Sequence, residues 1–79
     1  MPRYYFDIRE GQETVTDDEG TELVDLTMAR LEAANTITEL ANDHIPGDGP
    51  QHYISIIVRD ETGAAVIKMD LAFDTKVLI

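Results

Sequence analysis

Cysteine and tryptophan are absent from this 79-residue sequence, and basic residues are scarce. Without cysteine, the chain has neither a disulfide scaffold nor a thiolate metal site. Six Lys and Arg stand against 16 Asp and Glu, so the formal net charge is −10. Nucleic-acid phosphates and anionic membranes are bound by clustered Lys and Arg, which this composition does not supply. We therefore expect neither nucleic acid nor a membrane as a partner.

Long apolar runs are also missing. A signal peptide needs about 7–15 continuous apolar residues and a membrane span needs about 20. Charged side chains interrupt the opening stretch from Met1 to Arg9, and neither Asn35 nor Asn42 begins a glycosylation sequon. The length fits one small domain over residues 1–79. We expect a cytoplasmic protein.

The usual catalytic motifs are not present. The five glycines match no phosphate-binding spacing. Ser55 is the single serine and has no Gly-x-Ser-x-Gly elbow around it, so a polar residue on an outward strand face is the simpler interpretation. We expect a chain that is not an enzyme and has no cofactor.

Alternation marks the first segment as a strand pair. Tyr4, Phe6 and Ile8 alternate with polar or aromatic neighbours, which is the period of a half-buried strand. The β-branched run 14–16 predicts a short second strand. A turn follows at residues 17–20, and residues 21–24 extend or end the second strand.

A helix is predicted from about Leu26 to His44, with Asp25 as its N-cap. At 100° per residue, the apolar side chains of this helix form one arc, whose small members allow close packing on a sheet. The arc consists of Leu26, Ala29, Ala33, Ala34, Ile37, Leu40 and Ala41. Met28 and Leu31 are exceptions, because they lie toward the polar side. Pro46, Gly47, Gly49 and Pro50 then predict a loop.

The last segment predicts a β-hairpin around the turn 60–63, a type I turn with a glycine bulge. Setting Arg59 opposite Ala64 places Ile56 against Ile67 and aligns the apolar positions of both strands. The predicted fold is α+β with element order β-β-α-β-β. It is an antiparallel-rich sheet of four strands with one helix packed on one face.

The hairpin face away from that helix has an apolar centre made by Ile57 and Val66, where polar residues are expected. One interpretation is ordinary strand propensity on an exposed face. The other is a homodimer interface, to which we assign Tyr53, Ile57, Val66 and the apolar tail Val77, Leu78 and Ile79.

Two sets of polar residues suggest a metal site, and each has a simpler interpretation. Asp43, His44, Asp48 and His52 surround the loop after the helix, but their spacing matches no metal motif, and His44 suits the last helical turn as a cap. The acidic run 17–19 lacks the alternating ligands of a calcium loop, so a solvated turn explains it.

Several segments together resemble a bacterial family of short domains of unknown function. They are the opening Met1-Pro2-Arg3-Tyr4-Tyr5-Phe6-Asp7-Ile8-Arg9, the turn Asp18-Glu19-Gly20-Thr21-Glu22-Leu23, the helix start Asp25-Leu26, and Val58-Arg59-Asp60-Glu61-Thr62-Gly63. The resemblance covers nearly the whole chain and implies no activity. The chain also resembles the HicB-type antitoxins, although Val24-Asp25-Leu26 keeps only the Asp-Leu part of their Pro-Asp-Leu step.

These observations favour a small acidic module that acts by protein–protein contact as a homodimer. One alternative is an antitoxin-like regulator that binds a basic protein partner, which the acidity suits. Another is a weak metal or small-ligand binder at the loop Asp43–His52. The charge is uneven, since residues 1–25 carry eight acids and two bases while residues 51–79 carry four and three. The nearly neutral last hairpin is thus the expected docking side.

Overall fold

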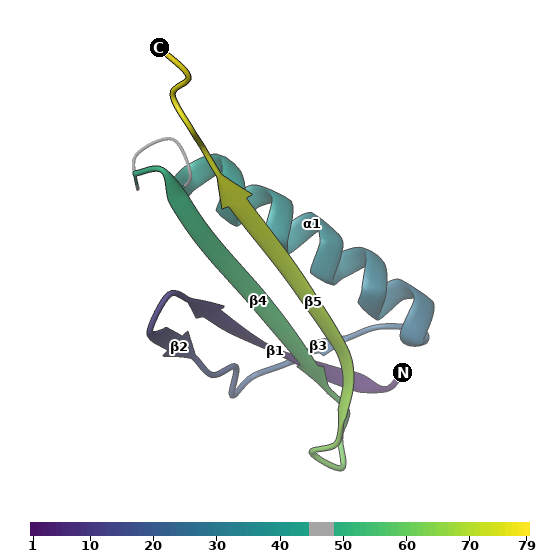
Figure 1. Cartoon of the computed structure of the whole chain (residues 1–79). Coiled ribbons are helices and arrows are strands. Elements are labelled where there is room, and N and C mark those ends of the chain that lie inside the picture. Colours follow the sequence, from purple (N-terminus) through teal and green to yellow (C-terminus); the bar gives the residue numbers. More distant parts are fainter. Residues whose placement is uncertain (45–48) are drawn as a thin grey trace.

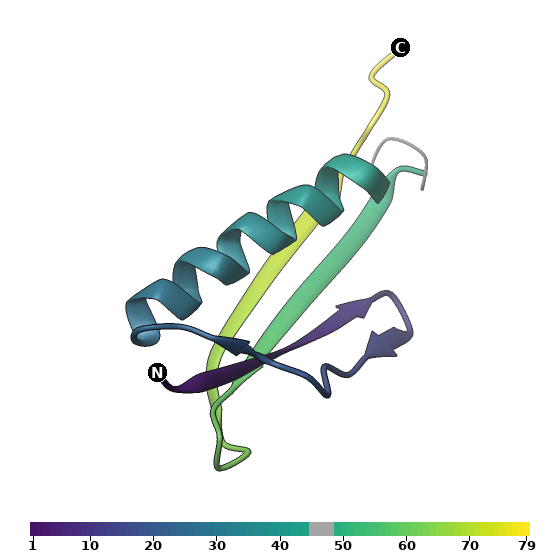
Figure 2. The same cartoon turned by 180° about the vertical axis from the view of Figure 1, so that it is seen from behind.

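The sheet is the frame of the molecule in the computed structural model, which describes residues 1–44 and 49–79. Its elements are β1 (Arg3–Glu10), β2 (Glu13–Val15), β3 (Thr21–Glu22), α1 (Leu26–His44), β4 (Gln51–Arg59) and β5 (Ala65–Asp74). All strand pairs are antiparallel, in the order β2-β1-β4-β5, with β3 also paired to β1. Within the described residues α1 packs over β4 and β5, on one face of the sheet (Figures 1 and 2). The predicted α+β class is confirmed.

The helix has the predicted bounds. Its cap forms as expected, because the Met28 N–H donates to Asp25 Oδ1 at 3.0 Å. Ala29 and Ala33 are fully buried, so the helix backbone approaches the sheet closely. Leu26, the first residue of the predicted arc, stays half exposed.

The core is centred on β4. Ile54, Ile56 and Val58 are fully buried under the helix, whereas their neighbours on β1 and β5 are only partly buried. Those neighbours include Phe6 and Ile8 on β1, and Ile67, Met69 and Leu71 on β5. The helix therefore covers the middle of the sheet better than its flanks.

The hairpin forms, but its predicted register is wrong by two residues. Ile56 lies opposite Met69 instead of Ile67, and Val58 lies opposite Ile67. The predicted type I turn and glycine bulge are present, since the Gly63 N–H donates to the carbonyl of Asp60 at 3.0 Å and Gly63 has φ +89°. A second irregularity between Val58 and Arg59 adds to the shift. An even total shift keeps the same side chains on the helix face.

The sheet has a fifth strand where four were predicted. β3 pairs Thr21 with Tyr4 and Glu22 with Arg3, beyond the end of β2. A two-residue strand is too short to show periodicity in the sequence, and only its return to β1 defines it. The predicted loop positions Pro46 and Gly47 lie outside the described residues. Among the residues that the structure does describe, no helix is long and apolar enough to span a bilayer.

Candidate functional site

Arg59 at the end of β4 and Asp7 in the middle of β1 form a two-pronged ion pair. Nε donates to Asp7 Oδ2 at 2.7 Å and Nη2 donates to Oδ1 at 3.1 Å. Nη2 also donates to the carbonyl of Asp17 at 3.0 Å, and the guanidinium lies 5.1 Å from the centre of the Tyr5 ring. The hydrogen bonds from Arg59 hold the pKa of Asp7 below its usual value. Arg59 thus ties two strands and a turn together.

Asp17 organises the acidic turn. One oxygen accepts the N–H groups of Glu19 and Gly20, each at 3.0 Å, and the other accepts the Phe6 N–H of β1 at 3.0 Å. Burial opposes ionisation of Asp17, but these N–H donors outweigh it and lower its pKa. The Asp7 carboxylate also bonds to this turn, because its Oδ1 accepts the Asp17 N–H at 3.0 Å. The turn considered for calcium therefore uses the Asp17 carboxylate to order the backbone.

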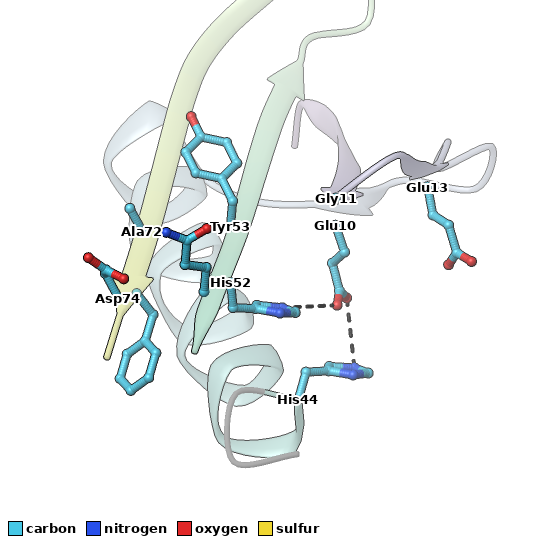
Figure 3. A pocket seen from close by; sticks show the side chains of 10 residues that line it. Glu10, Gly11, Glu13, His44, His52, Tyr53, Ala72 and Asp74 are labelled. Carbon is cyan, nitrogen blue, oxygen red and sulfur yellow. Dashed lines mark ion pairs between the residues drawn. The ribbon is translucent and has the colours of Figure 1, made fainter. Parts of the chain in front are cut away.

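A second cluster lies where β1 and β4 come closest to the end of α1. Glu10 lies between two histidines, with Oε1 at 3.7 Å from His44 Nε2 and Oε2 at 3.6 Å from His52 Nε2 (Figure 3). The two imidazole planes are nearly parallel at 3°, with centroids 6.4 Å apart. Glu10 comes to this place because β1 pairs it with Ile54, two residues from His52.

These three side chains border an open groove of about 720 Å³ that also includes Tyr53, Ala72 and Phe73. Of the four loop residues proposed as metal ligands, the structure brings His44 and His52 together, and Asp48 lies outside the described residues. Over residues 1–44 and 49–79 there is no group of three or more His, Cys, Asp or Glu arranged to hold a metal ion. The contacts of Glu10 with the two histidines connect the ends of β1, β4 and α1.

On the outer sheet face, which points away from α1, Ile57 lies between Asp7 on β1 and Lys68 on β5. The predicted register placed Val66 directly opposite Ile57, and the two-residue shift puts Lys68 in that position. Ser55 on this face is only 6% exposed and donates its hydroxyl to Asp70 Oδ1 at 2.7 Å.

The other predicted interface residues are exposed. Tyr53 is 48% exposed and is paired with Ala72 on β5. Val77, Leu78 and Ile79 follow β5 and point away from the body of the protein, with most of their surface open (Figure 1).

On the helix side, α1 leaves a smaller groove over β1 and β2. Its apolar floor consists of Phe6, Ile8 and Val15, and Val15 is 64% exposed. Carboxylates border this floor from the acidic turn and from the helix: Asp17, Asp18, Glu19 and Glu32. An apolar floor with an acidic border can accept a segment that is both basic and apolar.

Sequence reasoning missed Asp7, Asp17 and Arg59 as a unit, and missed Glu10 beside the histidines. A signal for Asp7 is present, because an Asp inside a strand is unfavourable unless a partner satisfies it. For Glu10 there is no such signal, since its position depends on which strand pairs with β1.

A family model for a domain of unknown function, DUF6894, matches residues 3–72, which is most of the chain. The protein belongs to the DUF6894 family. The predicted resemblance to a family of short domains of unknown function is thereby confirmed. The match runs from the start of β1 almost to the end of β5, so the DUF6894 domain contains both polar clusters, and the tail 77–79 lies beyond it. Neither the curated proteins nor the solved structures include a match to this DUF6894 chain.

Proposed function

We propose that this DUF6894 domain is a non-enzymatic interaction module that works as a homodimer in the cytoplasm. The observation that carries the proposal is the open edge of β5, a strand of ten residues that, among the described strands, pairs with β4 on one side only. Long unprotected edges pair readily with another strand. The hairpin β4–β5 is also the least acidic part of the chain, so two copies meet there with little charge repulsion.

The shape of the chain supports the same proposal. Its radius of gyration is 14.1 Å, against about 12 Å for a compact domain of this length. Its extents of 53 × 22 × 17 Å, to which the extended tail after β5 contributes, describe a long, thin molecule (Figure 1). A chain with so little interior gains stability by burying more surface against a partner.

The non-enzymatic part of the proposal rests on the side chains that could react. The Ser55 hydroxyl is buried and donates to Asp70, so a substrate has no access to it. The carboxylates of Asp7 and Asp17 are engaged by Arg59 and by backbone N–H groups. The cluster of Asp7, Asp17 and Arg59 therefore serves the fold.

Light scattering coupled to size-exclusion chromatography tests the homodimer. At tens of micromolar protein we expect a mass of about twice the 8.8 kDa of one chain. A mass of one chain across that concentration range contradicts the proposal.

A second candidate is a regulator that binds a basic protein partner, favoured by the groove with the apolar floor of Phe6, Ile8 and Val15. We expect a Lys- and Arg-rich peptide with one aromatic residue to bind there, and to bind more weakly as salt rises. Glu32→Lys, on the groove border, should weaken this binding in fluorescence anisotropy. Glu39→Lys is the matched control, because Glu39 lies on the same helix outside the groove. Equal affinities of both variants contradict this candidate.

A further inference from the structure

The pairing geometry of β5 identifies which backbone groups face its open edge. The Thr75 N–H donates to the carbonyl of Pro50 at 2.7 Å, so residue 75 bonds toward β4. Hydrogen-bonded and non-hydrogen-bonded pairs alternate in an antiparallel ladder. The N–H and C=O groups of the even-numbered residues Lys68, Asp70 and Ala72 therefore point away from β4, toward the open edge.

We infer that a second copy of the chain pairs with this edge, β5 against β5 and antiparallel, about a two-fold axis at Met69. The inference rests on the proposed homodimer and specifies its surface. In this register Lys68 of each copy lies opposite Asp70 of the other. Since both residues have outward-facing backbone groups, they form the hydrogen-bonded pairs that such a ladder requires.

Charge distinguishes this register from its neighbours. An axis at Lys68 or at Asp70 sets two like charges directly opposite each other, which destabilises an antiparallel pair. The axis at Met69 instead makes two opposite-charge pairs on the outer face, where Lys68 and Asp70 are both exposed. It also places Val66 opposite Ala72 of the second copy, which brings one of the predicted interface residues into the contact.

Apolar burial on the helix face favours the same arrangement. Ile67, Met69 and Leu71 are only partly buried, because α1 covers β4 more fully than β5. With the axis at Met69, Ile67 lies opposite Leu71 of the second copy, and Met69 lies opposite its own equivalent. The core of each copy then continues into the other.

The helix offers a matching flank. A two-fold axis perpendicular to the sheet places both helices on one face, antiparallel to each other, on either side of the new strand pair. Ala41 borders a groove with Leu71 and Phe73, so its side of the helix is the one toward β5. The residues on that side of the helix are spaced four, three, four and three apart, as are the contact residues of helices that pack side by side. They are Thr27, Leu31, Ala34, Thr38 and Ala41.

Two single charge reversals and their mixture test the register. In a dimer of Lys68→Glu chains, each new carboxylate lies opposite Asp70 of the other copy. In a dimer of Asp70→Lys chains, each new ammonium group lies opposite Lys68. Each variant alone should therefore dimerise about tenfold to a hundredfold more weakly than the unchanged chain, by sedimentation equilibrium. An equimolar mixture should recover dimers, because the mixed dimer sets two carboxylates of one chain opposite two ammonium groups of the other.

Asp74→Lys is the matched control, since it changes the net charge as Asp70→Lys does but faces Ala64 in this register. We expect it to dimerise like the unchanged chain, and circular dichroism verifies that all variants are folded. A monomeric unchanged chain overturns the proposed homodimer itself. A dimeric unchanged chain whose two reversals also dimerise normally, or whose mixture does not recover dimers, overturns only the β5 register.

Discussion

At the scale of single residues, the carboxylates of Asp7 and Asp17 each accept hydrogen bonds on both oxygens. Their partners come from three places that are far apart in the sequence: β1, the acidic turn and the end of β4. Both carboxylates have lowered pKa values. Folding therefore favours their ionised forms, and the network strengthens the fold wherever those forms persist.

Asp7→Asn should reduce the free energy of unfolding at pH 7 by about 1–3 kcal/mol, because half-buried Arg59 loses its charged partner. The folded pKa of Asp7 is below its ordinary value of 3.8, so the unfolded chain binds this proton more readily. The stabilisation is complete well above pH 4 and is lost as the pH falls through the folded pKa. The difference between variant and unchanged chain should thus shrink below about pH 4 in urea titrations. Asp18→Asn, in the same turn, is the control, and a pH-independent difference contradicts the prediction.

Gly20 occupies a position that only glycine fits without strain. Its φ is +72°, and an added Cβ would lie 2.8 Å from Arg3 Cγ and 2.9 Å from Tyr5 Cε1. Gly11 also has positive φ, +58°, but open space around it. Both alanine variants place an L side chain at positive φ, which is strained, and Gly20→Ala should cost about 1 kcal/mol more, because the neighbouring side chains must also move. Equal midpoints in thermal unfolding would show that Arg3 and Tyr5 adapt freely.

At the scale of elements, the sequence determines each helix or strand more clearly than the way the strands meet. The bounds of α1 were predictable because its cap and its apolar arc are both local. The hairpin register was not, because the irregularity at Val58 and Arg59 depends on contacts across the sheet. Strand β3 and the position of Glu10 beside His52 depend on the pairing of β1, which local periodicity does not encode.

Helix α1 leaves three large apolar side chains about equally open, Leu26 at 47%, Leu31 at 45% and Met28 at 43% exposed. The flank toward β5 contains Leu31, whereas Met28 lies about 100° away from Thr27 of that flank around the helix. Leu31→Glu should therefore weaken the dimer several-fold in sedimentation equilibrium, because it places a charge between the paired helices. Met28→Glu should leave the dimer intact, and equal effects of both variants would contradict helix pairing.

At the scale of the whole molecule, the small interior leads us to expect that stability depends on the proposed association. Seven hydrophobic residues form the buried core of the described chain. If much of the stability comes from the second copy, unfolding must follow the law of mass action.

A tenfold dilution should lower the thermal midpoint by about 4 °C. The dilution removes about 1.4 kcal/mol of association free energy from the dimer. The shift is this loss divided by the unfolding entropy of the two chains, which together have about 160 residues. Scanning calorimetry at two concentrations measures the shift. A midpoint that does not change with concentration would mean that the folded monomer is stable alone.

The two edges of the sheet are unequal, and this sets a limit on growth. On the β1 side, β2 and β3 occupy the outer edge and the Asp17 carboxylate bonds the Phe6 N–H between them, so the described strands leave no long row of donors there. On the other side, β5 is open. A subunit with one open edge can pair with one other chain by that edge, and pairing about a two-fold axis uses the open edges of both copies. In the proposed dimer, assembly by this edge would therefore end at two chains, and the sheet would not extend into a fibre.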